Sequence, residues 1–305
     1  MRICSLLPSA TEIAYALGLG DDVVGVTHEC DYPPEAKGKR VVVHSAIASE
    51  RLNSREIDKQ VGDLLRAGKS IYTIDQNALR EAAPDIILTQ DLCDVCAIDS
   101  NEVSMAISFL PREPRIVSLS PTTLTNVLRD MEKVGAMTGR APEAALLAQQ
   151  LNRRIAGVRE KTESISARPR VACLEWFEPL YAAGHWIPEM VEWAGGHDGL
   201  GRKGEPSAKV KWQNVADYAP EVMVLMPCGF DLERTIKEGE PLQQLTGWKD
   251  LPAVKSGRIF AVNGGAFFSR PGPRLVDGLE LLARLIHPKL FQTAPAPAAA
   301  RRVSG

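Results

Sequence analysis

The stretch from Pro142 to about Ile165 constrains the fold of this chain most, because it has the pattern of one long, unbroken helix. Pro142 suits the first helical turn, where its missing N–H is no loss, and Gly139 separates the stretch from the helix before it. At 1.5 Å per residue the helix would be roughly 36 Å long, about the height of a small domain. We therefore expect a helical strut with comparable α/β material on either side. Its apolar stripe, with spacings of three and four residues, consists of Leu147, Leu151, Ile155, Val158, Thr162 and Ile165.

Short apolar runs alternate with helical patterns on both sides of this strut. Such alternation is typical of α/β proteins with a mostly parallel, helix-covered sheet. We therefore predict two Rossmann-like lobes with mostly parallel sheets, joined by one long backbone helix. The strands expected before the strut are Ile3–Leu7, Val23–Thr27, Val41–Val43, Ile71–Ile74, Asp85–Thr89 and Arg115–Leu119, and those after it are Arg170–Leu174, Val222–Met226 and Ile259–Val262.

The strut and its flanks predict four segments. Residues 1–122 form an N-terminal α/β lobe, 123–166 the connecting helices, and 167–290 a C-terminal α/β lobe, while 291–305, rich in Ala and Pro, form a disordered tail. A weak internal sequence similarity indicates that the two halves are related. Ala83-Pro84-Asp85 resembles Ala219-Pro220-Glu221, and the stretch from Arg2 to Leu6 resembles the one from Arg115 to Leu119.

Composition excludes several classes of protein. The net charge of −2, from 36 basic and 38 acidic residues, gives no reason to expect nucleic acid or an anionic membrane as partner. No apolar run approaches the 18 or so residues of a membrane-spanning helix. Six cysteines in 305 residues are too sparse for a disulfide scaffold. Because the sequence enters a strand directly after Met1-Arg2, without a leader pattern, we predict a cytoplasmic protein, exported only if the true start lies upstream.

Aromatic residues concentrate in segments expected to be loops at the carboxyl ends of strands. In open parallel sheets, ligands bind beyond those ends, and we expect the two lobes to leave a cleft there. Aromatic side chains in such loops suit a large, flat, partly apolar ligand. Arg270 adds a side chain that can hold amide or phosphate oxygens. The aromatic residues concerned are Tyr32, Trp176, Tyr181, Trp186, Trp212, Phe267 and Phe268.

Several of these segments carry a resemblance to a known family. The stretch from Ser5 to Glu12, the Asp31-Tyr32-Pro33-Pro34 loop, the two Ala-Pro-acidic turns and the stretch from Phe268 to Arg274 are similar to the vitamin B12-binding branch of the ABC-transporter substrate-binding proteins. The resemblance runs in order over roughly residues 2–288. It implies two α/β lobes on one backbone helix, the class III periplasmic-binding-protein-like architecture of the helical backbone metal receptors.

The resemblance also implies a ligand and the residues that contact it. In that family a cobalamin or related corrinoid lies in the cleft against aromatic side chains of both lobes. Tyr32 corresponds to the tyrosine of the Asp-Tyr-Pro-Pro loop, and Tyr181 to the aromatic residue before the Gly184 turn. Trp212 corresponds to the second-lobe tryptophan, and Phe267 and Phe268 to an aromatic pair near the last strand. Trp176, Trp186 and Arg270 are further candidates for contact with this ligand.

Two positions depart from the family pattern. Members that dock on a membrane permease present one glutamate per lobe, and the corresponding positions here are Asn77 and Gln213. Neither side chain is charged, so electrostatic steering and ion pairs with a permease would be lost. The resemblance therefore predicts an intracellular corrinoid-binding protein, for which an ABC permease is a disfavoured partner.

The cysteines offer an alternative. Cys93-x-x-Cys96 has the spacing of a redox pair or of half a zinc site, and His28 and Cys30 are further candidate metal ligands. This pattern is compatible with a thiol metalloprotein or an oxidoreductase. The sequence contains no Ser/His/acid set, phosphate-cradling glycine loop or His-Glu-x-x-His motif. We therefore predict a binding protein rather than an enzyme.

Overall fold

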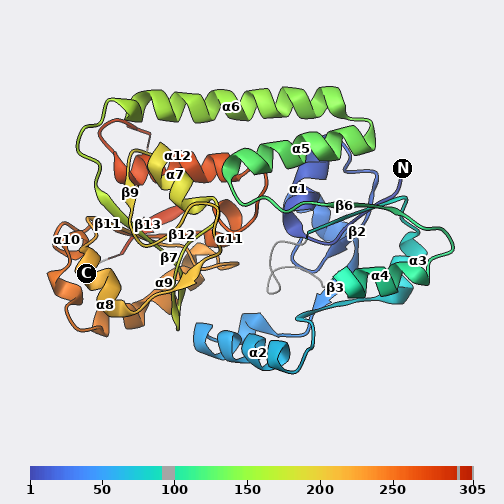
Figure 1. Cartoon of the computed structure of the whole chain (residues 1–305), viewed down its shortest axis with the longest axis horizontal. Coiled ribbons are helices and arrows are strands. Elements are labelled where there is room, and N and C mark those ends of the chain that lie inside the picture. The colour runs from blue at the N-terminus through green and yellow to red at the C-terminus, as the bar shows by residue number, and fades with distance from the viewer. Residues whose placement is uncertain (91–99, 294–295, 304–305) are drawn as a thin grey trace. The chain divides into compact units, whose positions relative to one another are not determined.

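The computed structural model of the chain describes residues 1–90, 100–293 and 296–303 (Figure 1). The chain folds into two compact units, each with its own sheet and core. The predicted division treats residues 123–166 as a separate connecting segment, whereas the structure distributes these residues over both units. Unit 1 consists of Met1–Leu52, Glu56–Pro121 and Thr125–Gln149, and unit 2 of Asn53–Arg55, Thr122–Leu124 and Gln150–Gly305.

Unit 1 is built on a six-stranded sheet with the strand order β4-β3-β2-β1-β5-β6. All neighbouring strands are parallel except the edge pair β3 and β4, which is antiparallel. The predicted strands all exist, and most of their bounds agree to within two residues. The strands are β1 (Ile3–Ser5), β2 (Val23–Thr27), β3 (Arg40–Ser45), β4 (Tyr72–Ile74), β5 (Ile86–Thr89) and β6 (Arg115–Ser118).

The helices of unit 1 bury their apolar sides against this sheet. Leu79 and Ala82 of α3 and Val103 and Ile107 of α4 join one buried cluster with Cys4, Val42 and Ile87 of the strands. Burial of this kind is the main source of stability in such a layer. The helices are α1 (Pro8–Ala16), α2 (Ser54–Arg66), α3 (Gln76–Ala82), α4 (Ser100–Ser108) and α5 (Leu124–Thr138), with short 3₁₀ turns η1 (Pro34–Gly38) and η2 (Ser49–Arg51).

The predicted strut is confirmed as α6 (Ala141–Glu163), which Figure 1 traces as one unbroken helix. Its 23 residues correspond to a length of roughly 35 Å. The stripe residues Leu151, Ile155 and Val158 are buried as expected. Residues up to Gln149 belong to unit 1 and the rest to unit 2, where Arg154 donates to Asp277 and Glu280 of α12.

Unit 2 is built on a seven-stranded sheet with the order β10-β8-β7-β11-β12-β13, and β9 also pairs with β7. The central strands β7, β11 and β12 are parallel, while β8, β10 and β13 run antiparallel to their neighbours. The prediction of mostly parallel sheets therefore holds at the centre and fails at the edges. The strands are β7 (Arg170–Phe177), β8 (Leu180–Ala182), β9 (His197–Asp198), β10 (Ala208–Lys209), β11 (Val222–Leu225), β12 (Ile259–Val262) and β13 (Ala300–Arg302).

The core of unit 2 forms between this sheet and helices on its faces. Trp248 packs with Val215, Met223 and Ile259 in one buried cluster, and α7 packs against α12. The helices are α7 (Ile187–Trp193), α8 (Trp212–Tyr218), α9 (Leu232–Gly239), α10 (Pro252–Lys255), α11 (Gly264–Phe267) and α12 (Leu275–Ile286), with 3₁₀ turns η3 (Glu240–Gln244) and η4 (Trp248–Asp250).

The two units repeat one local motif at the start of their central strands. In unit 1 the backbone N–H of Arg2 donates to Asp85, and its guanidinium donates to the carbonyl of Ala82 at the end of α3. In unit 2 Arg170 donates in the same way to Glu221 and to the carbonyl of Ala219 at the end of α8. The similarity between the two Ala-Pro-acidic segments therefore corresponds to a structural repeat. In this repeat the equivalent of Arg2 is Arg170, whereas the sequence comparison paired Arg2 with Arg115.

The predicted disordered tail is wrong for residues 300–302. These residues form β13, which pairs with β12 so that Phe260 lies opposite Arg302 and Val262 opposite Ala300. Arg301 also makes a two-pronged ion pair with Glu233 of α9. Composition alone suggested disorder, whereas the open edge of β12 supplies backbone partners that order this short segment.

Candidate functional site

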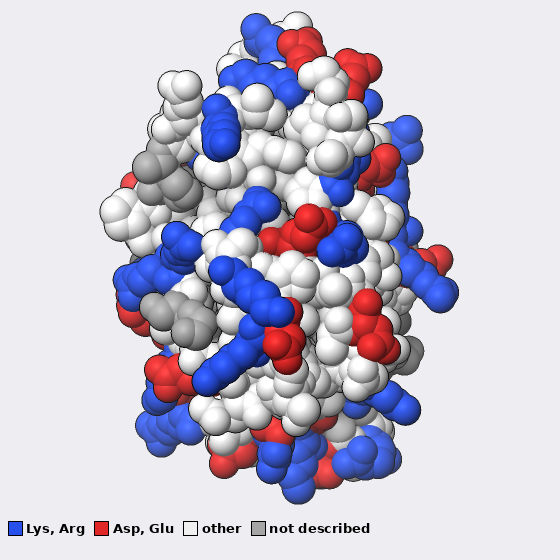
Figure 2. All heavy atoms as spheres, turned by 90° about the vertical axis from the view of Figure 1, so that its left-hand side faces the viewer, with Lys and Arg blue, Asp and Glu red and all other residues white. Residues whose placement is uncertain are grey.

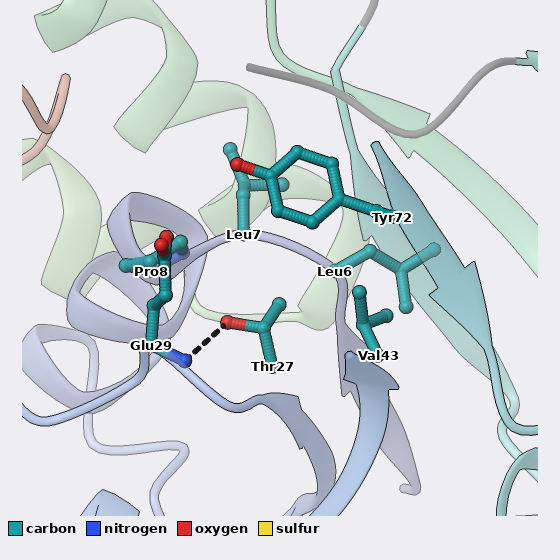
Figure 3. Close-up of a pocket in the computed structure, with 7 residues that line it drawn as sticks. All are labelled: Leu6, Leu7, Pro8, Thr27, Glu29, Val43 and Tyr72. Carbon is teal, nitrogen blue, oxygen red and sulfur yellow. Dashed lines mark hydrogen bonds between the residues drawn. The ribbon is translucent and has the colours of Figure 1, made fainter. Parts of the chain in front are cut away.

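A small cavity lies at the carboxyl end of the unit 1 sheet. Its walls come from β2, β3 and β4, the start of α1 and the loops after β1 and β2, and its volume of about 20 Å³ gives room for one water molecule. Figure 3 shows the ring of Tyr72 above Leu6 and beside the side chain of Leu7, with Glu29 beside Pro8. The backbone N–H of Glu29 donates to Thr27 Oγ1 at 3.1 Å, which fixes the turn after β2. The lining residues are Leu6, Leu7, Pro8, Thr27, Glu29, Val43 and Tyr72.

His28, between two residues that line this cavity, is held by backbone and ring contacts. Its Nδ1 lies 3.2 Å from the carbonyl oxygen of Val43, which also accepts the backbone N–H of His28. The His28 ring is tilted against the ring of Tyr72, with the centroids 6.4 Å apart. Its other nitrogen, Nε2, lies 3.8 Å from Glu29 Oε1, and the side chain is 31% exposed. The imidazole is therefore oriented by its surroundings and reachable from outside.

The candidate thiols do not assemble into a metal site within the described part of the chain. Cys30 is 4% exposed, and its Sγ contacts the hydroxyls of Thr11 at 3.1 Å and Thr27 at 3.3 Å. Burial raises the pKa of the Cys4 thiol to about 12. Among the residues described, no three His, Cys, Asp or Glu side chains are grouped to hold a metal ion. Cys93 and Cys96 lie outside the described residues.

Aromatic side chains gather on the β7–β8 hairpin of unit 2. Trp176 of β7 lies opposite Tyr181 of β8 in the antiparallel register. The Trp176 ring packs at 5.2 Å on Phe230, and its Nε1 donates to the carbonyl of Ser54 at 3.1 Å. Cationic side chains lie over two of the rings: Lys209 Nζ is 5.5 Å from the Tyr181 centroid, and the Arg234 guanidinium carbon is 3.8 Å from that of Phe230. The hairpin thus presents a half-buried aromatic surface with positive charge at its border.

Next to this hairpin, the loops that follow β11 and β12 pack closely against each other. A Cβ on Gly264 would lie 2.3 Å from the carbonyl oxygen of Pro227, so only glycine allows the loops after β11 and β12 to pack this tightly. Ser269 ties the same loops together: its hydroxyl accepts from the N–H of Gly229 and donates to the carbonyl of Gly264. These contacts fix the loop that carries Phe230, whose buried ring supports Trp176.

The structure separates the predicted contact residues into two groups. Trp186 is 5% and Phe268 3% exposed, and Trp186 Nε1 donates to the carbonyl of Phe268, so both belong to the core of unit 2. Trp212 is half-buried; its ring is stacked on Trp248 with the centroids 5.9 Å apart, and its Nε1 donates to the carbonyl of Thr246. The other candidates keep accessible surface: Tyr32 is 44% exposed, and Trp176, Tyr181, Phe267 and Arg270 are half-buried.

The prediction that all seven aromatic residues fall in loops is wrong. Trp176 and Tyr181 lie on strands, Phe267 ends α11, and Trp212 begins α8. Tyr72, which lines the unit 1 cavity, was not predicted as a contact. Tyr72 sits in a short apolar run that reads as an ordinary strand, and only the antiparallel pairing of β3 and β4 brings it to His28.

The two positions compared with permease-docking glutamates occupy equivalent places. Asn77 is the second residue of α3 and Gln213 the second residue of α8, and both are exposed. Asn77 accepts from Arg80 at 3.1 Å, and Gln213 donates to Asp217 at 2.7 Å. The correspondence between these positions agrees with the repeat of the two units.

Comparison with known proteins decides the family. The family model described as periplasmic binding protein matches residues 3–264. The chain belongs to the periplasmic binding protein family. It is thus a substrate-binding protein of the ABC-transporter type. Since this is a family of binding proteins, the prediction that the chain is not an enzyme is confirmed.

Relatives of this periplasmic binding protein cover most of its length. An uncharacterized ABC transporter substrate-binding lipoprotein of Bacillus subtilis is 26% identical, over 95% of this chain and 81% of the relative. A vitamin B12-binding protein of Vibrio cholerae is also 26% identical, over 92% of this chain and 86% of the relative. The family resemblance inferred from the sequence is therefore confirmed.

Solved structures confirm the two-unit α/β fold of the family. The periplasmic vitamin B12-binding protein of Vibrio cholerae superposes with a TM-score of 0.68 at 23% identity, covering 96% of this chain and 98% of the other. A periplasmic heme-binding protein of Pseudomonas aeruginosa superposes with a TM-score of 0.73 at 17% identity, covering 100% and 99%. At these identities the likeness concerns the fold.

The predicted cytoplasmic location is wrong. The family is that of periplasmic binding proteins, and one relative that matches along 95% of the chain is a lipoprotein. The prediction used the start of the sequence as evidence, and family membership overrides it. None of the described helices is long and apolar enough to cross a membrane. On the face drawn in Figure 2, basic and acidic side chains are interspersed, in keeping with 36 basic and 38 acidic residues overall.

Proposed function

We propose that this protein binds a corrinoid of the cobalamin type as the substrate-binding component of a transport system outside the cytoplasm. The observation that carries the proposal is the similarity over 92% of the chain to a protein named for vitamin B12 binding. The identity of 26% along nearly the whole chain favours a related ligand as well as a related fold.

The geometry of unit 2 agrees with this ligand class. A corrin ring is broad and flat, and its rim carries amide groups. The Trp176 and Tyr181 rings offer apolar contact area to such a ring, while Lys209 at their border can donate to amide oxygens. We propose these residues as the contacts, in place of the buried Trp186 and Phe268.

A retention experiment tests the proposal. Purified protein is mixed with cyanocobalamin, desalted, and its visible absorption recorded; we expect the corrinoid bands to elute with the protein. Titration calorimetry then compares Trp176→Ala with Trp176→Phe. Both changes remove the hydrogen bond to Ser54, but only Trp176→Phe keeps an aromatic face. We expect Trp176→Ala to weaken binding by about 1–3 kcal/mol and Trp176→Phe by clearly less.

Two results would contradict the proposal. Loss of all corrinoid on desalting, together with retention of hemin under the same conditions, would show that the ligand is a porphyrin. Unchanged affinity in Trp176→Ala would remove the hairpin from the site. Tyr218→Phe serves as a control, because the Tyr218 hydroxyl bonds backbone groups of its own unit, among them those of Gly199 and His197, and keeps away from the hairpin aromatics.

A further inference from the structure

Trp176, Tyr181 and Lys209 form one row across three neighbouring strands of unit 2. Tyr181 of β8 is paired with Trp176 of β7 on one side and with Lys209 of β10 on the other. Residues directly opposite each other in antiparallel strands point to the same face of the sheet. Lys209 therefore shares a face with the two aromatic rings, and its Nζ lies 5.5 Å from the centre of the Tyr181 ring.

This row lies on the face of the hairpin that is directed away from the core of unit 2. Phe177 and Leu180, the next pair along the hairpin, are buried in that core. By contrast, Trp176 and Tyr181 are half-buried and Lys209 is exposed. A flat ligand that stacks on the two rings would therefore have the ammonium group of Lys209 at its edge.

Lys209 brings a positive charge to this edge that the carboxylates of the hairpin do not take up. Glu178, in the turn of the hairpin, pairs with Arg55, and Glu175 accepts a hydrogen bond from Ser207. Among the described residues, Lys209 takes part in no ion pair. Its contact with an aromatic ring is weak at an exposed position, so the ammonium group can turn from the ring to an anion.

We propose that Lys209 binds the phosphodiester group in the nucleotide loop of cobalamin, and so favours cobalamin over corrinoids that lack this loop. The inference rests on the proposed corrinoid function and concerns the selectivity of the same surface. The amide groups on the corrin rim are neutral, whereas the phosphodiester that joins the lower nucleotide to the ring is negatively charged. A lysine ammonium offers three N–H donors, and hydrogen bonds between charged groups are stronger than those between neutral ones.

Cyanocobalamin and dicyanocobinamide, which lacks the nucleotide loop, provide the test in titration calorimetry. Wild-type protein should bind cyanocobalamin more tightly, and sodium chloride should weaken this binding selectively because it screens an exposed ion pair. In Lys209→Met, the affinity for cyanocobalamin should fall about threefold to fivefold, as expected for one exposed ion pair. The affinity for dicyanocobinamide should stay unchanged. Lys209→Arg keeps the charge and should keep the preference.

Lys161→Met is the matched control. Lys161 of α6 also lies over an aromatic ring, with its Nζ 5.2 Å from the centre of the Phe291 ring, and the change removes the same charge. It should leave both affinities and the effect of salt as in the wild type. An equal loss of affinity for both corrinoids in Lys209→Met, or no loss, would overturn the role of Lys209 and leave the proposed function standing. Retention of neither corrinoid by the wild type would overturn both.

Discussion

Asp130 of α5 is a residue whose surroundings disfavour its own charge. Its Oδ2 is buried without a hydrogen-bond partner among the described residues, and burial raises the pKa of this carboxyl to about 6, against the opposing charge of Lys133. As pH rises past the ordinary pKa of aspartate, the unfolded chain loses its proton before the native state does. Asp130 therefore reduces the stability of the fold progressively between about pH 4 and pH 6, and the reduction is complete above that range.

We expect Asp130→Asn to stabilise the protein at pH 7.5 and to have little effect at pH 4. The gain in the free energy of unfolding should be about 1 kcal/mol. It should be smaller than the pKa shift of Asp130 alone implies, because the side chain is partly exposed to water, which lowers the cost of its charge. Chemical denaturation at the two pH values measures the difference. Asp21→Asn, at an exposed position, is the control. An equal effect of Asp130→Asn at both pH values would show that the amide acts through packing and not through charge.

At the same scale, sequence reasoning identified residue types better than residue roles. Aromatic residues near strand ends were visible in the sequence, but burial depends on which elements cover them, and Trp186 and Phe268 turned out to be core residues. His28 was singled out as a partner of cysteines. Its oriented imidazole depends on a carbonyl of β3, which is 15 residues away in the sequence.

The helices α3 and α8 end in the same strained backbone conformation. The helices α3 and α8 are each followed by an alanine in the left-handed region, Ala83 with φ of 41° and Ala219 with φ of 49°. A Cβ makes this conformation costly, whereas glycine adopts it freely. Each alanine precedes a proline, which cannot continue the helix, so the turn into the next strand needs this conformation.

We expect Ala83→Gly and Ala219→Gly each to raise the free energy of unfolding by about 0.5 kcal/mol, after the greater freedom of glycine in the unfolded chain is subtracted. Ala82→Gly, one residue earlier and inside α3, should instead lower it by about 1 kcal/mol. Thermal or urea denaturation measures all three. Destabilisation by both glycine changes at the left-handed positions would show that the alanine methyl groups contribute more through packing than they cost in strain.

Among the elements, those with a strong periodic pattern were predicted and those set by pairing were not. The strands of the parallel centres and the long helix α6 follow from local apolar patterns. The sequence pattern predicts a loop after Arg170–Leu174, whereas the residues on both sides of Glu178-Pro179 pair in register as the β7–β8 hairpin. The strand β13 was missed because its stability comes from β12, about 40 residues earlier in the chain.

At the scale of the whole molecule, α6 belongs to both units, with residues 141–149 in unit 1 and residues 150–163 in unit 2. Gly157 is its only interior glycine, and a Cβ there would meet no described atom within 4 Å. Glycine inside a helix is unfavourable because it has more freedom to lose on folding. This position therefore weakens α6 without any packing reason for glycine.

We expect Gly157→Ala to stabilise the protein by about 0.5–1 kcal/mol and to leave corrinoid affinity unchanged. Gly135→Ala on α5 is the matched control, since its Cβ would lie 2.4 Å from that of Ala144 and the change should destabilise. Calorimetric unfolding with and without ligand measures both effects. A change of affinity in Gly157→Ala would mean that the ligand-bound state requires α6 to bend at this residue.

The strand β13 has a consequence for self-association. The strand it covers, β12, is the apolar sequence Ile-Phe-Ala-Val, and its free edge would be a template for pairing with the strands of other molecules. β13 occupies that edge and replaces it with three residues, of which Arg301 and Arg302 are exposed cations. Short, positively charged edges repel a further strand. We therefore expect β13 to cover an edge of the second sheet that would otherwise be open to strand pairing between molecules.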